Sequence, residues 1–182
     1  MHATREHTPQ DLSYLVSITT GDVTADATGQ AVTVAAANAA DVVGAVAFAA
    51  EFGLPLAIDV PGAPAAKGGL LISTERLRGV HVDRVARTAI AQVGALWSDV
   101  VDRAREHGLA PLVPRHDGTG ILGSGYGWSA GHVLGIDAVT RDGRYRHVAP
   151  AADPRLFRRL CAVEPGDVEP GVVVAMTFTL FR

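Results

Sequence analysis

The spacing of apolar residues divides the first third of the chain into an arm, a strand and a helix. Residues 1–30 are mostly polar and predict an N-terminal arm that carries one short helix or strand. The β-branched run at 32–34 predicts a strand. Asn38 follows as the expected N-cap of a helix, with Asp41 at position N3. Gly53 is expected to end that helix, because glycine readily adopts the left-handed conformation after a last turn.

The next apolar runs predict a change from parallel to antiparallel strands. Residues 54–60 predict a second strand, 61–69 are rich in turn formers, and 70–72 predict a third strand. The order strand, helix, strand favours a parallel pair with a right-handed crossover. Residues 80–93 then alternate around a basic turn, which is typical of an antiparallel hairpin.

The second half of the chain adds two helices and a further antiparallel pair. A helical stripe is expected to end at Gly108, and Asp153 begins a second short helix. Asp142 and Gly143 lie between two extended runs, the dipeptide that most strongly predicts a hairpin. The apolar residues 171–181 predict the last strand. The fold class is therefore α+β, with an arm over 1–30 and one domain over 31–182, divided into a parallel part (31–79) and an antiparallel part (80–182).

Composition and charge narrow the classes of function. The chain has 182 residues, 48% of them hydrophobic, so it can bury a core, and its single Cys161 excludes an internal disulfide. The net charge is -3 and the basic residues are scattered, so nucleic acid is not an expected partner. The N-terminus lacks the apolar stretch of a signal peptide and no apolar run is long enough for a membrane span. A cytoplasmic protein without a membrane partner is therefore expected.

Ordered landmarks over residues 30–182 resemble one family, the FAD-binding (PCMH-type) domain of the vanillyl-alcohol oxidase/p-cresol methylhydroxylase superfamily, and especially the berberine-bridge-like oxidases. The segments that carry the resemblance are 38–56, 68–74, 91–112, 118–128, 133–144, 153–160 and 171–181. The resemblance implies a two-part module: a small parallel βαβ part beside an antiparallel sheet with helices, and FAD extended between them.

The resemblance also implies a weakened phosphate-binding turn after the second strand. The family has an Arg-Gly-Gly-Gly-His-like turn there, whose main-chain N–H groups hold the pyrophosphate and whose histidine often bonds the flavin. At the matching positions this chain has Asp59, Val60, Pro61, Gly62 and Ala63. Proline lacks an N–H donor, and a carboxylate beside a diphosphate costs on the order of 1 kcal/mol or more. FAD, if bound at all, is therefore expected to be noncovalent, with binding weakened or lost.

A second glycine motif of the family has a closer counterpart in this chain. In the first motif, the resemblance places Gly62 and Gly68 at the pyrophosphate. In the second motif, it places four residues along the ribityl chain or the flavin ring: Gly123, Gly125, Tyr126 and Gly127. Only four residues, 129–132, separate Trp128 from the next strand, so the flavin-wrapping loop of the family is largely missing. Relatives continue past the 171–181 strand into a substrate domain, which this chain is expected to lack.

Other candidate residues have ordinary structural interpretations. His116 and Asp117 are adjacent and rarely face each other, and His81, His107 and His132 lack metal-ligand spacing, so no metal site is expected. Trp97 is expected in the core, and Trp128 either in the core or stacked on a flat ligand. Lys67 could reach a phosphate but is more simply solvated. No catalytic residue can be named.

Three functions remain open. The first is a stand-alone FAD-binding-domain protein related to FAD-linked oxidoreductases, completed by a separate substrate-domain protein. The second is a flavin-free descendant whose cleft between the two parts binds another small molecule or catalyses a cofactor-independent reaction. The third is a noncatalytic interaction module, in which an uncovered apolar face would favour a homodimer.

Overall fold

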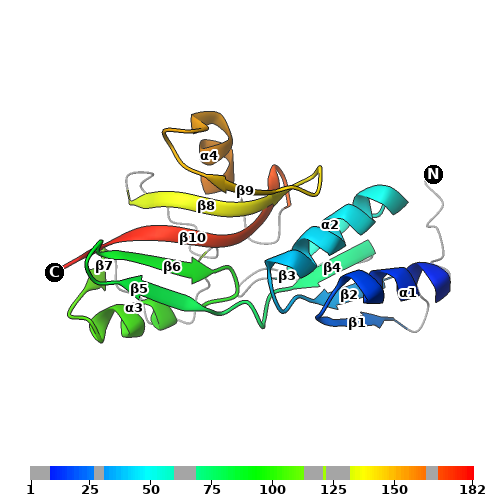
Figure 1. Ribbon diagram of the computed structural model, residues 1–182, viewed down its shortest axis with the longest axis horizontal. Coiled ribbons are helices and arrows are strands. Elements are labelled where there is room, and N and C mark those ends of the chain that lie inside the picture. The colour runs from blue at the N-terminus through cyan, green and yellow to red at the C-terminus, as the bar shows by residue number, and fades with distance from the viewer. Residues whose placement is uncertain (1–8, 27–30, 60–68, 113–120, 122–131, 163–167) are drawn as a thin grey trace.

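Two sheets lie side by side along the longest axis of the molecule (Figure 1). The computed structural model describes residues 9–26, 31–59, 69–112, 121, 132–162 and 168–182. The first sheet has the order β1-β2-β4-β3, with bounds β1 (Asp22–Ala25), β2 (Ala31–Ala35), β4 (Gly69–Ser73) and β3 (Leu56–Asp59). Strands β2, β4 and β3 are parallel, and β1 is antiparallel to β2. The helices of this part are α1 (Pro9–Ile18) and α2 (Ala39–Phe52).

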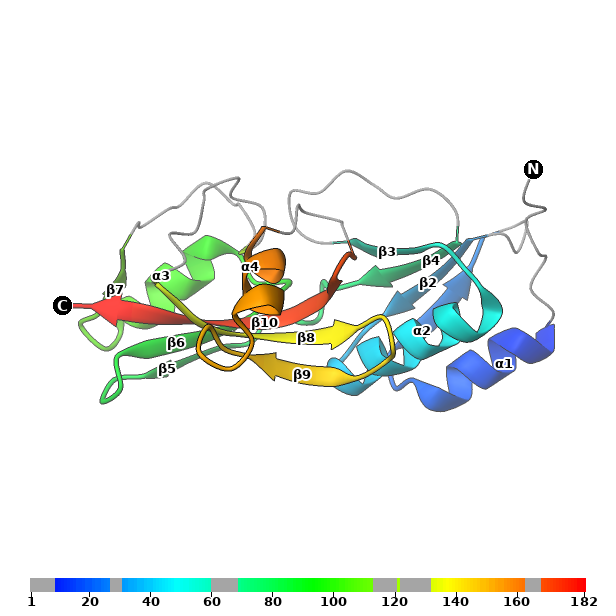
Figure 2. The ribbon, with the colours of Figure 1, turned by 90° about the horizontal axis from the view of Figure 1, so that it is seen from above.

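The second sheet is antiparallel throughout. Its order is β5-β6-β10-β8-β9, with bounds β5 (Val80–Asp83), β6 (Thr88–Gln92), β10 (Gly171–Phe181), β8 (Val133–Thr140) and β9 (Tyr145–Val148). The short β7 (Ala110–Pro111) also pairs with β10. Helices α3 (Trp97–Arg105) and α4 (Pro154–Cys161) lie in the half of the molecule that holds this sheet, and α1 and α2 lie in the other half (Figure 2). The predicted α+β class, with a parallel set followed by an antiparallel sheet, is confirmed.

Local sequence signals place the ends of α2 where they were predicted. The Asn38 side chain accepts hydrogen bonds from the main-chain N–H groups of Ala40 (2.8 Å) and Asp41 (3.2 Å), as an N-cap does. Gly53 follows the helix with φ +63°, the left-handed conformation that glycine adopts without strain. Both ends of α2 are therefore set by residues that the sequence identifies.

The predicted hairpin and the second short helix are also confirmed. Gly143 has φ +72° in the turn between β8 and β9. The Asp153 carboxylate accepts a hydrogen bond from the Leu156 N–H (2.9 Å) and caps α4. The last predicted strand corresponds to β10, which lies in the middle of the second sheet.

The described part of the N-terminal arm contains both a helix and a strand, where the sequence predicts one or the other. Val23 of β1 pairs with Val34 of β2, and Leu15 of α1 is fully buried. The Asp41 carboxylate, only 1% exposed, accepts hydrogen bonds from the N–H groups of Thr20 (2.7 Å) and Gly21 (3.0 Å). These contacts join the arm to the first sheet and to the start of α2.

Apolar residues from both parts form one continuous core. Trp97, expected in the core, is 7% exposed, and its ring meets that of Phe178 edge to face with 5.6 Å between centroids. No helix within the described ranges is long and apolar enough to cross a membrane.

Candidate functional site

The carboxyl ends of the three parallel strands form one edge of the first sheet. Ser73 at the end of β4 is in register with Ala35 of β2 on one side and with Asp59 of β3 on the other. Ligands of open parallel sheets bind beside the carboxyl ends of the strands, because the loops that follow converge there. This edge is the first candidate for a ligand-binding surface.

Thr74 fixes the carboxyl edge where the two parts of the molecule meet. Both its hydroxyl and its N–H donate to the Asp59 carbonyl oxygen, at 2.6 and 3.2 Å, and the residue is fully buried. Its own carbonyl lies so close to Gly94, in the turn after β6, that a Cβ on Gly94 would approach it to 2.0 Å. Only glycine allows this approach between main chains of the two parts.

Ile121 extends this arrangement to a third part of the chain. It is fully buried, and its N–H donates to the Ala95 carbonyl at 3.2 Å. We call Asp59, Thr74, Gly94, Ala95 and Ile121 the junction. Segment 60–68 directly follows Asp59, and segments 113–120 and 122–131 directly flank Ile121. The two glycine-rich stretches that the sequence singles out are therefore both connected to the junction.

The predicted binding residues themselves lie outside the described residues. This holds for all six predicted positions: Gly62, Gly68, Gly123, Gly125, Tyr126 and Gly127. It also holds for the other positions discussed in the same segments: Ala63, Lys67, His116, Asp117 and Trp128. Their assignment to a pyrophosphate, ribityl chain or flavin ring stays a prediction.

A cleft of about 490 Å³ lies between the two parts of the molecule. One wall comes from α2 and the start of β3, including Ala49, Gly53 and Leu56, and the other from β8 and β10, including Val139 and Gly171. Small residues on both walls leave the space open. Such a volume lies within the range of ligand pockets.

The cleft and the junction lie at opposite ends of β3. Leu56 is its first residue and Asp59 its last, so the two regions are about 10 Å apart at roughly 3.3 Å per residue. Arg141, mostly exposed and ion-paired with Glu169, also lines the cleft. These lining residues were not predicted from the sequence. The small residues Ala49, Ala50 and Gly53 at the end of α2 were the available sign that another part of the chain leaves a space there. Together the two regions offer an extended rather than a compact binding surface.

The histidines of the described segments do not form a metal site. His81 and His107 are exposed, and the His132 ring meets that of Phe181 edge to face at 5.7 Å. No group of three or more His, Cys, Asp or Glu that could hold a metal ion occurs among the described residues. Cys161 is half-buried, and burial raises the pKa of its thiol, which lowers its reactivity at neutral pH.

Sequence reasoning missed a carboxylate–histidine pair on the second sheet. His147 on β9 lies opposite Asp137 on β8, with 2.8 Å between Nδ1 and Oδ1. Burial, together with the nearby Asp137 carboxylate, raises the pKa of Tyr145 on the same strand. The His147 side chain is 60% exposed, and none of the three residues lines the cleft between the two parts.

Several solved structures share this fold. The chain is similar to 6-hydroxy-D-nicotine oxidase from Arthrobacter nicotinovorans, with 21% identity and a TM-score of 0.76 over 90% of this chain and 43% of that one. It is also similar to a BBE-like protein from Physcomitrella patens, with 14% identity and a TM-score of 0.79 over 94% of this chain and 44% of that one. Both likenesses show the shared fold.

Curated relatives give a sequence match over a shorter range. An uncharacterized FAD-linked oxidoreductase from Arthroderma benhamiae is 27% identical over 120 residues, which are 60% of this chain and 23% of that protein. The FAD-dependent monooxygenase tpcD from Cochliobolus heterostrophus is 25% identical over 135 residues, 68% of this chain and 26% of that protein. The chain thus spans about a quarter of the length of these relatives.

The family described as FAD binding domain matches residues 30–149, which is more than half of the chain. The matched range runs from the start of β2 past the end of β9. It therefore includes the junction and both glycine-rich stretches. The chain belongs to this family of FAD binding domains, related to FAD-linked oxidoreductases.

Proposed function

We propose that this chain binds FAD noncovalently and weakly, as the cofactor-binding part of an FAD-linked oxidoreductase. The observation that carries the proposal is the family match over 30–149 together with the junction. Bound FAD would supply the acceptor of electrons for an oxidation. Asp59 and Thr74 lie where the strand edge would meet the diphosphate, and the cleft along β3 has room for another part of an extended dinucleotide.

The residues at the carboxyl edge support weak rather than tight binding. Asp59 brings a carboxylate to the end of β3, and Pro61, two residues later, has no N–H to offer a phosphate. Each lost charge-assisted hydrogen bond costs roughly 1.5–3 kcal/mol, so two lost contacts weaken binding by about a hundredfold or more. Ala63, at the position of the family histidine, cannot form a covalent bond to flavin.

Titration with FAD, followed by the quenching of flavin fluorescence, tests this proposal. We expect a nearly colourless purified protein, saturable quenching with a Kd of about tens of micromolar, and no flavin in the acid-precipitated pellet. A Kd at low micromolar or below would contradict the weakened site, and flavin retained in the pellet would contradict noncovalent binding.

The Asp59→Asn variant tests the role of the carboxylate. Removing one charge near the diphosphate should tighten FAD binding about fivefold, because a unit charge pair at about 4 Å in water contributes about 1 kcal/mol. Glu51→Gln, which removes an exposed carboxylate from α2, is the matched control and should leave the Kd unchanged. Equal effects of the two variants would contradict a specific role of Asp59.

The substituted turn also favours a second candidate function. In that case the cleft between the two parts holds a different small molecule, and FAD shows no saturable binding even near millimolar concentration. Turnover of a substrate is a further step. We propose that it requires residues in addition to these 182, since the chain spans only 43–44% of the similar proteins of known structure.

A further inference from the structure

One stretch of the chain has a charge opposite to that of the rest. Residues 141–159 contain six arginines and two aspartates, whereas the remaining residues contain ten basic and seventeen acidic side chains. The stretch covers the β8–β9 turn, β9 and most of α4. The basic residues, which were expected to be scattered, are therefore concentrated in this stretch, because it holds six of the sixteen.

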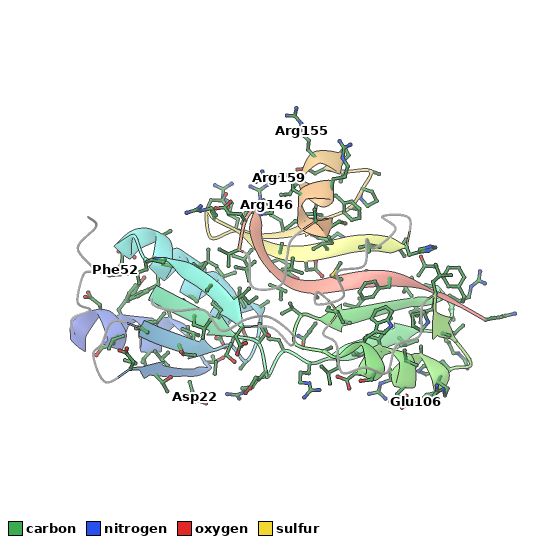
Figure 3. All side chains as sticks on the ribbon, turned by 180° about the vertical axis from the view of Figure 1, so that it is seen from behind. Asp22, Phe52, Glu106, Arg146, Arg155 and Arg159 are labelled. Atoms are coloured by element: carbon green, nitrogen blue, oxygen red, sulfur yellow. The ribbon has the colours of Figure 1, made fainter. Side chains whose placement is uncertain are left out.

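Three of these arginines line one open hollow of about 430 Å³ on the α4 side of the second sheet. Arg146 comes from β9, and Arg155 and Arg159 come from α4, one helical turn apart. Figure 3 shows all three around α4, on the same side of the molecule. Leu156 contributes an apolar surface to the same hollow.

The scaffold holds these arginines in place. Arg146 donates from Nε to the Thr140 hydroxyl at 3.2 Å, and its terminal nitrogen lies 3.4 Å from an Asp142 carboxylate oxygen. Helix α4 is fixed by its Asp153 cap and by its buried Phe157. The guanidinium groups are therefore presented by two anchored elements rather than by a loop.

The charges of the hollow are only partly balanced. Asp142 already accepts from Thr140 and is ion-paired with Arg144 and Arg146, and Asp153 is engaged as the helix cap. Within the described residues Arg155 and Arg159 have no carboxylate within ion-pair distance, unlike Arg141, Arg144 and Arg146. Two like charges one turn apart on a helix repel each other, so an external anion would be favoured between them.

We propose that this hollow, which we call the arginine hollow, binds the phosphate group of a phosphomonoester, at a site that shares no lining residue with the cleft between the two parts. Planar guanidinium groups donate paired hydrogen bonds that match phosphate oxygens. Two cations without a carboxylate partner among the described residues match a dianion better than a monocarboxylate. The Leu156 side chain would contact the organic part of the ester.

Phenyl phosphate is a suitable probe, because it combines the dianion with one apolar ring. In an NMR titration at constant ionic strength, the Nε–H signals of Arg155 and Arg159 should shift saturably, with a Kd of about a millimolar. Benzoate, a monoanion of similar size, should bind at least about fivefold more weakly. Lowering the pH from 7.5 to 5 should weaken phenyl phosphate binding, because the second phosphate pKa is about 6.

Two double variants distinguish a specific phosphate site on α4 from a nonspecific effect of the protein's net charge on phosphate binding. Arg155→Gln with Arg159→Gln should weaken phenyl phosphate binding at least about tenfold. Arg103→Gln with Arg105→Gln removes the same charge from exposed positions on α3 and should leave it unchanged. Equal weakening by both pairs, benzoate binding as tight as phenyl phosphate, or no saturation would overturn the proposal. The Kd for FAD should be the same in the Arg155→Gln, Arg159→Gln variant as in the wild type. A failure of the phosphate proposal can therefore be told apart from a failure of the FAD proposal.

Discussion

Replacement of the buried Asp41 by asparagine should strongly destabilise the protein. The carboxylate accepts hydrogen bonds from the N–H groups of Thr20 (2.7 Å), Ala37 (2.8 Å) and Gly21 (3.0 Å), and from the Thr20 hydroxyl. An asparagine oxygen can keep the Thr20 contacts, but its NH2 group then faces the donors of Gly21 and Ala37. Two hydrogen bonds to a charged group are lost, at roughly 1.5–3 kcal/mol each, so we expect a loss of about 3 kcal/mol or more in the free energy of unfolding.

Urea unfolding of Asp41→Asn and the wild type at pH 7 measures this loss. Asp22→Asn, which removes an 83% exposed carboxylate paired with Arg76, is the control and should cost less than about 1 kcal/mol. A loss below about 1 kcal/mol for Asp41→Asn, with an unchanged m-value, would refute the reasoning.

The pH dependence gives a second check on Asp41. Burial alone would raise the pKa of Asp41, but the hydrogen bonds from Thr20, Ala37 and Gly21 together lower it below its usual value. A carboxyl group whose pKa is lower in the folded state stabilises the protein above its unfolded-state pKa, near 4. That stabilisation is lost as the pH falls through the folded-state pKa. The difference in stability between the wild type and Asp41→Asn should therefore shrink as the pH is lowered below about 4.

Three further predictions concern the junction and the single cysteine. Thr74→Val removes the hydroxyl that donates to the Asp59 carbonyl and should cost about 1 kcal/mol in urea unfolding, whereas Thr74→Ser should retain most of the stability. Gly94→Ala would place a Cβ 2.0 Å from a main-chain oxygen and should prevent stable folding, which circular dichroism would show as a loss of the native spectrum. In the control Gly108→Ala the new Cβ meets no atom within 4 Å, and the φ of +67° should cost only about 1–2 kcal/mol in the free energy of unfolding. Cys161 should react more slowly with a thiol reagent at pH 7 in the native protein than in urea, because burial raises its thiol pKa; equal rates would contradict this.

Signals within a few residues of each other predicted the local structure well. Asn38 and Gly53 mark the ends of α2, and Asp142 with Gly143 marks the β8–β9 turn, because caps and tight turns depend on side chains close in sequence. The order β2-β4-β3, with β4 in the middle, was not predicted, because strand order depends on long-range pairing.

Contacts between distant segments were beyond the reach of sequence patterns. Asp41 was expected only as an N3 residue, but most of its hydrogen bonds come from residues about twenty positions earlier. The arginine hollow depends on α4 lying beside β9, which the spacing of Arg146 and Arg159 does not reveal. The resemblance to a known family supplied the FAD-binding interpretation, because the individual glycines could not distinguish a tight turn from a ligand site.

The central position of β10 has a consequence for synthesis on the ribosome. All strands of the first sheet lie before residue 74, so that sheet can assemble while the chain is still being translated. Among the described strands of the second sheet, β10, the last of them to emerge, joins the β5–β6 hairpin to the β8–β9 hairpin. Until then both hairpins expose an edge that other chains could pair with. Cotranslational folding should therefore proceed in two stages, with the second sheet at risk of aggregation until residues 171–181 leave the exit tunnel.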